Sequence, residues 1–441
     1  MAAIALDVRV LSAAVLLAVL TGLLFGIVPA IQLSKPDLAS ALRESARGMS
    51  AGRTRQRLRS ALVAGEIALA VVLLVGALLF IGSFVALMRV DIGFNPDRVL
   101  VALVSPRREP GSRPPDASAA FVALAERLRE VPGVTHAAVI GGGIPLGGTS
   151  NVSFLTVPGG PQIPNDDGIT LRRVTHDYHA TMQIPLRTGR YFESKDRQGS
   201  QPVVILNESA AKKYFAAENP IGRTVEMGGD LTVVGIVGDV HQSSLESAPA
   251  AEVYVPMAQA RIGFAEIVVR TGGNPWDLLP AIKAASLSVL PDIPLRSVST
   301  MEGIVAQQTA ARRLNMLLLG AFGLLGLVIS AAGIYGVMAY VVSQRTREIG
   351  VRMALGATRA SISHMVLASA GRMLIAGLVV GTLGAWSLKA TATRFLFRLQ
   401  GDDPRAFLIA VVLLSAVALL ASLVPARRAA RVDPLEALRA E

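Results

Sequence analysis

The chain has 441 residues, of which 52% are hydrophobic and 17% are charged, and it contains no cysteine. So apolar a composition argues against a purely soluble protein, and the lack of cysteine excludes a disulfide framework. The formal net charge of +11 would suit nucleic-acid binding, but the arginines gather beside apolar runs. We therefore expect no nucleic-acid partner and interpret the charge as a sign of membrane topology.

Five apolar runs, taken in chain order, are each long enough to cross a membrane as a helix, for which about 20 residues suffice. They predict a membrane protein with an α-helical transmembrane bundle of five spans. The alternative is a set of buried helices in a large soluble protein. Two runs contain one ionisable residue each, Glu66 and Arg372. The runs are residues 11–31, 61–88, 314–343, 365–388 and 406–426.

Arginine clusters follow the first, third and fifth runs. If the runs cross alternately, these clusters share one side of the membrane, which the positive-inside rule assigns to the cytoplasm. The long stretch between the second and third runs then lies outside. No basic region precedes the first run, so we interpret it as a retained span. The predicted parts are a leading helix with a cytoplasmic linker (1–60), a second helix (61–90), an extracytoplasmic domain (91–312) and a three-helix membrane domain (313–441).

The two ends of the chain are similar to each other. Residues 7–43 align without gaps with residues 403–439, and both segments contain V-P-A and, further on, A-L-R. Several matches lie outside the apolar runs, where shared hydrophobicity cannot produce them. We therefore interpret the first helix as the remnant of a preceding repeat, which would make the chain the C-terminal part of a tandem duplication.

Between residues 91 and 312 the pattern changes to short β-rich runs separated by helices and turn signals. This pattern predicts a large α+β extracytoplasmic domain in two lobes. The predicted helices are 117–130, 208–215 and 276–290. The predicted strands are 99–104, 134–140, 152–157, 169–174, 203–206, 231–237, 252–255, 267–270 and 295–298.

A long helix is predicted where this domain returns to the third run. Ser299 and Glu302 form an S-x-x-E capping box, and no proline follows until after the run, so we expect a helix over residues 300–343. At 1.5 Å per residue it would be about 66 Å long, roughly twice the thickness of the hydrocarbon core. The alternative is a break near Gly303 or Ala311. The many glycines of the predicted helix indicate close packing against other helices.

The signatures of common enzyme classes are absent from the sequence. It has no G-x-x-x-x-G-K-[ST] P-loop, no H-E-x-x-H zinc motif and no G-x-S-x-G nucleophile elbow. We therefore expect no catalytic activity, cofactor or metal in this chain. His176, Asp177 and His179 could together form a metal site, but a surface pair of histidines is the simpler interpretation.

The segment R-E-I-G-V-R-M-A-L-G-A-T, residues 347–358, separates the third and fourth runs. Wound as a helix at 100° per residue, it would carry a charged stripe on one side and small residues on the other. Such a helix could pack on the membrane helices and offer its charges to a soluble partner. The alternative is a loop whose arginines only set the topology. The stripe consists of Arg345, Glu348, Arg352 and Arg359.

Glu66 and Arg372 lie near the cytoplasmic ends of the second and fourth runs in the predicted topology. Ionisable residues inside a span are functional candidates, so an intramembrane ion pair is one interpretation. In the other, each side chain reaches the headgroup region separately.

Several motifs, taken together, resemble one family. R-E-I-G-V-R-M-A-L-G-A at 347–357 and V-P-A-R-R-A-A-R-V-D-P-L-E-A-L-R at 424–439 are similar to the cytoplasmic motif and the C-terminal signature of FtsX-like ABC transporter permeases, the group of the MacB and LolC/LolE type. The middle resembles a MacB-type periplasmic core domain. The segments concerned are L-R-T-G-R-Y-F (186–192), V-V-I-L-N-E (203–208), P-I-G-R (220–223) and V-V-G-I-V-G-D-V (233–240).

The resemblance implies a permease subunit of an ABC-type efflux or mechanotransmission transporter in the bacterial inner membrane. It also implies that the charged helix docks a separate ABC ATPase subunit, whose ATP hydrolysis moves the extracytoplasmic domain. A homodimer or a second permease copy, and membrane lipids, would be further partners. The chain departs from MacB in its extra leading helix and in the lack of a fused ATPase, a pattern that resembles the duplicated orphan permeases, tandem two-copy members without a linked ATPase. The alternative function is an ATP-independent receptor or scaffold that transmits an extracytoplasmic signal.

Overall fold

The structure of the protein is a computed structural model with two compact units. The first unit comprises Met1–Leu69, Val328–Gly381 and Leu414–Glu441, and the second comprises Ala70–Leu327 and Thr382–Leu413. The residues that the structure describes are 12, 15–16, 50–105, 116–147, 151–159, 168–216, 218–393, 396–397 and 401–431.

Four of the described helices are long and apolar enough to cross a membrane. They are α3 (Ser50–Met88), α8 (Met301–Gln344), α10 (Arg359–Ser387) and α12 (Pro404–Ala429). Their positions confirm that the second to fifth apolar runs are helical. The first run, residues 11–31, lies outside the described residues except for residues 12, 15 and 16. The similarity between residues 7–43 and 403–439 is therefore not tested by the structure.

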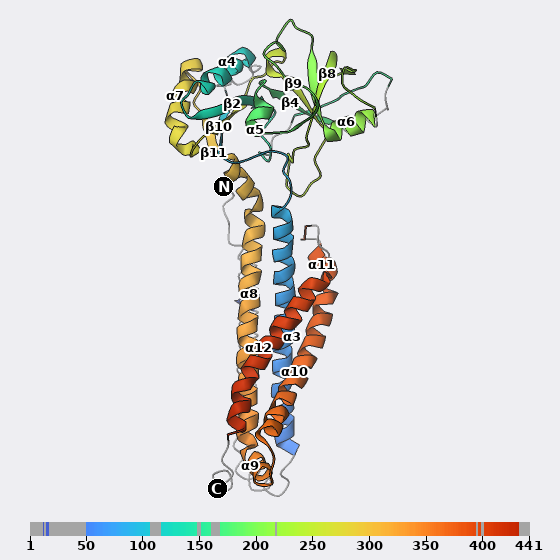
Figure 1. Cartoon of the computed structure of the whole chain (residues 1–441), viewed down its shortest axis with the longest axis vertical. Helices are drawn as coiled ribbons and strands as arrows, with labels where there is room; N and C mark the ends of the chain where they lie inside the picture. The colour runs from blue at the N-terminus through green and yellow to red at the C-terminus, as the bar shows by residue number, and fades with distance from the viewer. Residues whose placement is uncertain are drawn as a thin grey trace. The chain divides into compact units, whose positions relative to one another are not determined.

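Helix α8 is unbroken over all 44 of its residues, and Figure 1 shows it as one continuous ribbon. The prediction of a single long helix is confirmed, and the alternative of a break near Gly303 or Ala311 is wrong. Two of its glycines lie close to α3 within the second unit. A Cβ at Gly323 would meet Ala77 Cβ at 3.5 Å, and one at Gly326 would meet Ala70 Cβ at 3.3 Å. Small residues on both helices therefore allow the close packing that the glycines predicted.

The start of α8 differs from the predicted capping box by one residue. Ser299 belongs to the preceding strand, β11 (Arg296–Thr300), and Thr300 Oγ1 accepts the hydrogen bond of the Gly303 amide at 3.1 Å. Glu302 Oε1 accepts instead from the Arg98 amide at 3.0 Å. Because Met301 is the first helical residue, the N-cap is Thr300, and its side chain reaches the free amide of Gly303 three positions later.

The second unit contains a mixed sheet of eleven strands, with the order β11-β1-β10-β2-β4-β9-β6-β8-β5 and with β3 beside β4 and β7 beside β8. Pairs β4–β9 and β6–β8 are parallel, and the others are antiparallel. Nine of the strands coincide with predicted ones, although β3 is shorter than expected, and the short strands β5 and β7 were missed. The remaining strands are β1 (Val99–Val104), β2 (Val134–Gly141), β3 (Val152–Ser153), β4 (Ile169–Val174), β5 (Leu186–Gly189), β6 (Val203–Asn207), β7 (Thr224–Glu226), β8 (Asp230–Val237), β9 (Glu252–Pro256) and β10 (Ala265–Thr271).

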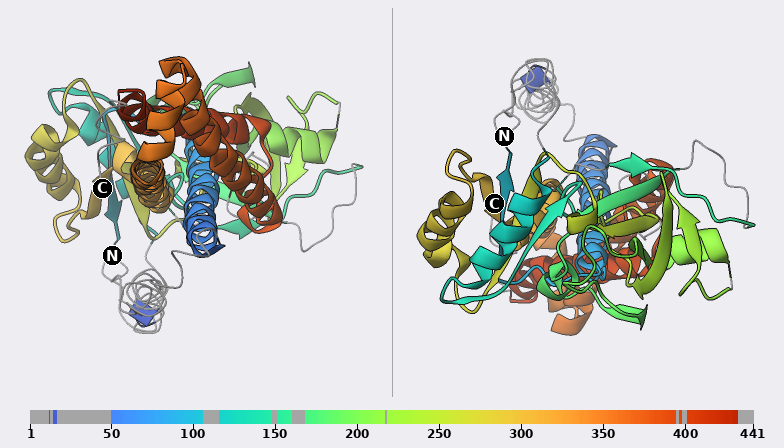
Figure 2. Two further views of the ribbon diagram at one scale, coloured as in Figure 1. Left: turned by 90° about the horizontal axis from the view of Figure 1, so that it is seen from below. Right: turned by 90° about the horizontal axis from the view of Figure 1, so that it is seen from above.

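Helices cover this sheet near both ends (Figures 1 and 2). Helices α4 (Ser118–Arg129) and α7 (Leu279–Val289) pack with alternate residues of β1, β2 and β10. Helix α6 (Glu208–Phe215) packs with alternate residues of β6. The intervening residues of the same strands face a third cluster, so these strands are buried on both faces, which explains their almost continuous apolar sequences. The two predicted lobes are therefore two ends of one sheet.

The described part of the first unit has its own hydrophobic core. Residues of α3, α8, α10 and α12 meet there, among them Ile67, Met338 and Val366. A Cβ at Gly377 of α10 would lie only 2.6 Å from Ile67 Cβ. The glycine therefore permits a contact between α10 and α3 that no larger residue would allow without movement.

Candidate functional site

The charged segment between α8 and α10 forms a short helix, α9 (Thr346–Ala354). Ile349, only 2% exposed, joins the core of the first unit together with Ile362 of α10. After α9 the chain turns at Gly356, whose φ of +94° is a left-handed conformation that glycine adopts without strain. Thr358 Oγ1 then accepts the Ser361 amide at 3.3 Å near the start of α10. A buried isoleucine and a glycine turn thus fix the position of α9.

The four residues of the predicted charged stripe do not share one helix. Arg345 precedes α9, Glu348 and Arg352 lie within it, and Arg359 begins α10. The prediction of one helix through all four is wrong because Gly356 ends the helical path. Glu348 Oε1 accepts a hydrogen bond from Arg352 Nη2 at 2.6 Å, whereas the nearest Arg345 nitrogen lies 4.0 Å from the Glu348 carboxylate. Both partners of the closer pair are about half exposed, so the pair adds little stability and remains accessible to a partner.

Apolar side chains that the sequence analysis did not single out lie beside this ion pair. Val351 is 40% exposed and Leu355 is 83% exposed. Leu355 follows α9 directly, one residue before the glycine turn. Single exposed apolar residues are common on protein surfaces, so Leu355 and the ion pair together are only a candidate contact for another protein. In the sequence, this exposed side chain is indicated by Leu355, a leucine placed between the small residues of the A-L-G-A turn.

Glu66 and Arg372 are not brought together as an ion pair. The Glu66 carboxylate lies against Gly333 of α8, in the position that a Cβ would occupy, and its Oε2 atom is buried without a hydrogen-bond partner among the described residues. Arg372 is exposed and donates from Nη2 to Ser369 Oγ at 3.3 Å. The interpretation in which the two side chains act separately therefore fits the structure better.

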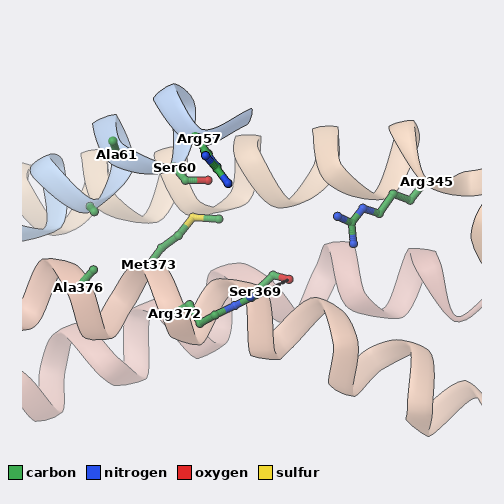
Figure 3. A pocket seen from close by; sticks show the side chains of 9 residues that line it. Arg57, Ser60, Ala61, Arg345, Ser369, Arg372, Met373 and Ala376 are labelled. Atoms are coloured by element: carbon green, nitrogen blue, oxygen red, sulfur yellow. Dashed lines mark hydrogen bonds between the residues drawn. The ribbon is translucent and has the colours of Figure 1, made fainter. Parts of the chain in front are cut away.

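Arg372 instead lines a cavity together with Arg345, a residue of the predicted charged stripe. A cavity of about 460 Å³ is lined by residues from α3, the α8–α9 junction and α10. Figure 3 shows Arg57, Arg345 and Arg372 around it, each from a different one of these segments. Arg57 belongs to the arginine cluster that follows the first apolar run. The sequence indicates only a topological role for this cluster, because it lies far along the chain from Arg345 and Arg372. The complete lining is Arg57, Ser60, Ala61, Ala64, Arg345, Ser369, Arg372, Met373 and Ala376.

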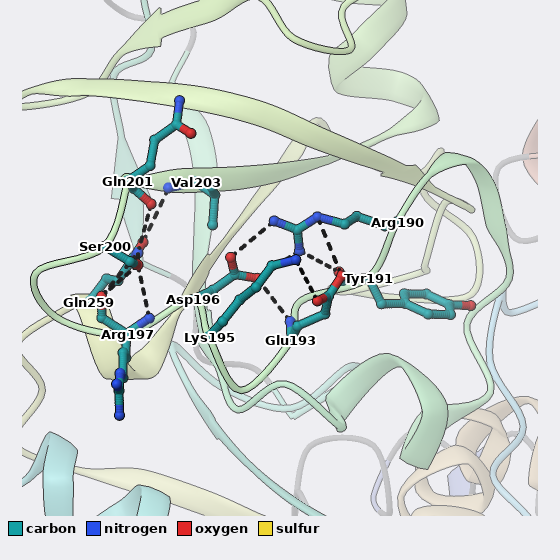
Figure 4. A network of polar contacts seen from close by, with 10 residues as sticks. All are labelled: Arg190, Tyr191, Glu193, Lys195, Asp196, Arg197, Ser200, Gln201, Val203 and Gln259. Atoms are coloured by element: carbon teal, nitrogen blue, oxygen red, sulfur yellow. Dashed lines mark hydrogen bonds and ion pairs between the residues drawn. The ribbon is translucent and has the colours of Figure 1, made fainter.

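In the second unit, the motif L-R-T-G-R-Y-F forms a clamp on the loop that follows it (Figure 4). Arg190 donates two hydrogen bonds to Asp196, from Nη1 at 2.7 Å and from Nη2 at 3.0 Å. Burial alone would raise the pKa of Asp196, but the Arg190 hydrogen bonds and the Glu193 amide hold it below its ordinary value. Gly189, with φ +83°, approaches the Val234 carbonyl so closely that a side chain would not fit. The motif therefore has a structural role.

A second polar network lies inside the sheet. Arg172 Nε lies 3.3 Å from Glu252 Oε1, and the two side chains are 1% and 0% exposed. Glu252 also accepts hydrogen bonds from Gln242 at 2.9 Å and from the Tyr254 hydroxyl at 2.8 Å. Burial raises the pKa of Glu252, while these donors and Arg172 favour its ionised form. No sequence motif predicts this network, although the charged residues inside the apolar strands β4 and β9 are its signal.

The two neighbouring histidines have different environments. His179 is fully buried, stacked on Tyr191 at 5.5 Å between ring centroids and edge-on to Tyr254 at 4.8 Å. Burial lowers its pKa to about 3, so it is neutral. His176 lies 3.5 Å from Asp177, which pairs with Arg129 at 2.6 Å. The expectation of a surface histidine pair is wrong for His179, because its ring completes an aromatic core.

Two family profiles match the chain. The profile of the MacB-like periplasmic core domain matches residues 60–285, and that of the FtsX-like permease C-terminal domain matches residues 320–434. The first match alone covers just over half of the sequence. The chain belongs to the MacB-type permease family. The resemblance of its motifs to this family is thereby confirmed, and both the clamp and α9 of this MacB-type permease lie inside the matched ranges.

Curated relatives of this MacB-type permease are export proteins. The macrolide export ATP-binding/permease protein MacB of Hahella chejuensis is 28% identical over 62% of this chain and 43% of its own length. The pyoverdine export ATP-binding/permease protein PvdT of Pseudomonas aeruginosa is 26% identical over 67% of this chain and 48% of its own length. The chain therefore spans less than half of these relatives. The solved periplasmic region of MacB from Actinobacillus actinomycetemcomitans is 19% identical over 51% of this chain and 98% of that region, with a TM-score of 0.35.

Proposed function

We propose that this MacB-type permease is the membrane subunit of an ABC exporter and that a separate ATP-binding subunit docks on α9. The observation that carries the proposal is the exposed surface at the C-terminal end of α9, where Leu355 follows a helix that bears the half-exposed Glu348–Arg352 ion pair. Buried Ile349 holds this surface on the core of the first unit. A displacement of α9 by a partner would therefore reach α8 and α10 directly, since their residues share that core.

The names of the relatives support an ATP-driven export function, because they combine ATP binding with a permease. The 441 residues contain no P-loop, and we propose that a separate subunit supplies the ATP site, as the resemblance of the motifs implies. We further propose that the arginine-rich ends of the helices face the cytoplasm of a bacterial inner membrane and that the sheet domain lies outside. A second permease copy would complete the transporter.

The proposed mechanism is mechanical. ATP-driven closure of the partner would move α9, and the unbroken α8 would transmit this motion to the sheet domain. Helix α8 is joined directly to that domain, because it begins at the residue after strand β11. The support for rigid transmission is the length of α8, about 66 Å at 1.5 Å per residue, with no proline in it. The substrate would then be moved by the extracytoplasmic domain.

The test compares variants of α9 with a matched variant on α12. The full chain is purified with a candidate ABC ATPase and reconstituted in lipid, and ATP hydrolysis is measured. Arg352→Glu places like charges beside Glu348 and Leu355→Asp removes the apolar contact. Each is therefore expected to raise the permease concentration that gives half-maximal stimulation of ATP hydrolysis at least about tenfold. Arg427→Glu changes another exposed arginine of the first unit and should have no effect. Full stimulation by both α9 variants would contradict docking at α9, and no stimulation by the unmodified chain would favour the receptor or scaffold alternative.

A further inference from the structure

The cavity of the first unit (Figure 3) has an unusual concentration of positive charge. Arg57, Arg345 and Arg372 line it together with the hydroxyl groups of Ser60 and Ser369, and no carboxylate is found among its described lining residues. Three cations that line one cavity repel one another, and although solvent screens part of this repulsion at such exposed side chains, a bound anion would relieve it. The geometry therefore calls for a negatively charged occupant.

The arginines of this cavity also have few competing partners. Within the described part of the chain, Arg57 has no ion pair and Arg372 bonds only to the Ser369 hydroxyl. Arg345 lies 4.0 Å from Glu348, whose closer partner is Arg352 at 2.6 Å. Each guanidinium group can therefore turn two or more N–H donors toward a ligand, an arrangement that suits phosphate oxygens.

The rest of the lining is apolar and belongs to helices that are candidates for membrane spans. Ala61 and Ala64 come from the span Arg59–Met88, and Met373 and Ala376 from the span Arg359–Ser387. Among the described lining residues there is no aromatic ring on which a nucleotide base could stack. The walls are thus suited to an acyl or glycerol group and not to a base.

We infer that this cavity binds the phosphate headgroup of an anionic phospholipid. The three arginines hold the phosphate, Ser60 and Ser369 offer hydrogen bonds to it, and the alanine and methionine side chains contact the glycerol and the first acyl carbons. The volume of about 460 Å³ is in the range of small-ligand sites. Basic pockets between membrane helices are known to suit such headgroups. The bound lipid would compensate the cost of an arginine such as Arg372 within a span.

The experiment measures lipid binding to the full chain in detergent by native mass spectrometry, without an ATPase. Phosphatidylglycerol and cardiolipin are compared with phosphatidylcholine, and inorganic phosphate and ATP serve as soluble sources of the same chemistry. Arg57→Gln and Arg372→Gln should each weaken binding of the anionic lipids about fivefold, and the double variant about 25-fold. Arg372→Lys should retain more binding than Arg372→Gln, and Arg427→Gln on α12 should bind like the unmodified chain.

Equal binding by the double variant and the unmodified chain would overturn the inference. Binding of phosphatidylcholine as tight as that of phosphatidylglycerol, or binding of ATP or inorganic phosphate tighter than that of the lipids, would also overturn it. Thermal unfolding of each variant without lipid shows whether it is folded, and Arg372→Lys supplies a second measurement if Arg372→Gln does not fold. Since no ATPase is present, failure of this inference leaves the docking result of α9 unchanged.

Discussion

Arg172 and Glu252 face each other inside the sheet of the second unit, on the parallel strands β4 and β9, as an ion pair shielded from solvent. Arg172 also donates to the Gly143 carbonyl at 2.7 Å and to Gln242 at 2.8 Å. The pair therefore links two strands and the loop after β2. Removal of one partner of such a pair leaves an uncompensated buried charge.

Glu252→Gln is accordingly expected to destabilise the sheet domain by about 3–5 kcal/mol. The measurement is chemical unfolding of the full chain followed by tryptophan fluorescence. The chain has two tryptophans, so a Trp386→Phe background leaves Trp276 of the sheet domain as the probe. Glu208→Gln, which breaks the half-exposed pair with Arg187, is the control and should cost less than about 1 kcal/mol. Similar losses of unfolding free energy for both variants would contradict the prediction that burial makes the pair of Glu252 more costly to break than the half-exposed pair of Glu208.

Glu266 gives the stability of the sheet domain a pH dependence. Burial raises its pKa from 4.5 to about 7, although the charge of Arg172 opposes the change. Between these two pH values the folded chain binds more protons at this site than the unfolded chain, so stability falls as the pH rises from about 4.5 through about 7. The expected loss is at most about 3 kcal/mol.

Glu266→Gln should remove this contribution. The variant is expected to be more stable than the unmodified chain at pH 8 and to differ little from it at pH 4.5, in unfolding experiments on the same Trp276 probe. Other groups titrate in this range, so the quantity compared is the difference between the two proteins at each pH. A difference that does not change with pH would show that Glu266 ionises normally.

The close contact between Gly377 and Ile67 predicts that the first unit does not tolerate a side chain at position 377. A Cβ at Gly377 would lie 2.6 Å from Ile67 Cβ and 2.8 Å from the Ala64 carbonyl oxygen, and neither atom can move without its backbone. Gly377→Ala should therefore destabilise the chain in detergent by about 1–3 kcal/mol. Gly371→Ala, on the same helix with no atom within 4 Å, should be neutral or stabilising because alanine favours helix. Equal thermal stability of the two variants would contradict the close approach of α3 and α10.

The sequence by itself determined most of the elements of the fold. Apolar runs and β-rich runs are local patterns, and they predicted the helices α3, α8, α10 and α12 and nine of the strands. The capping position at Thr300 differed by one residue, since the strand that precedes it sets where the helix begins. The family, too, was already indicated by its motifs. Local signals were sufficient wherever a few neighbouring residues decide the conformation.

Only the tertiary structure decided which distant side chains meet. Arg57, Arg345 and Arg372 share a cavity although they lie on three segments, and His179 is buried although its neighbour His176 is not. The pairing of Glu66 with Arg372 was allowed by their positions along the helices, but the rotation of α3 directs Glu66 toward Gly333 instead. Helix rotation and strand order depend on packing across the whole core, and no short stretch of sequence contains that information.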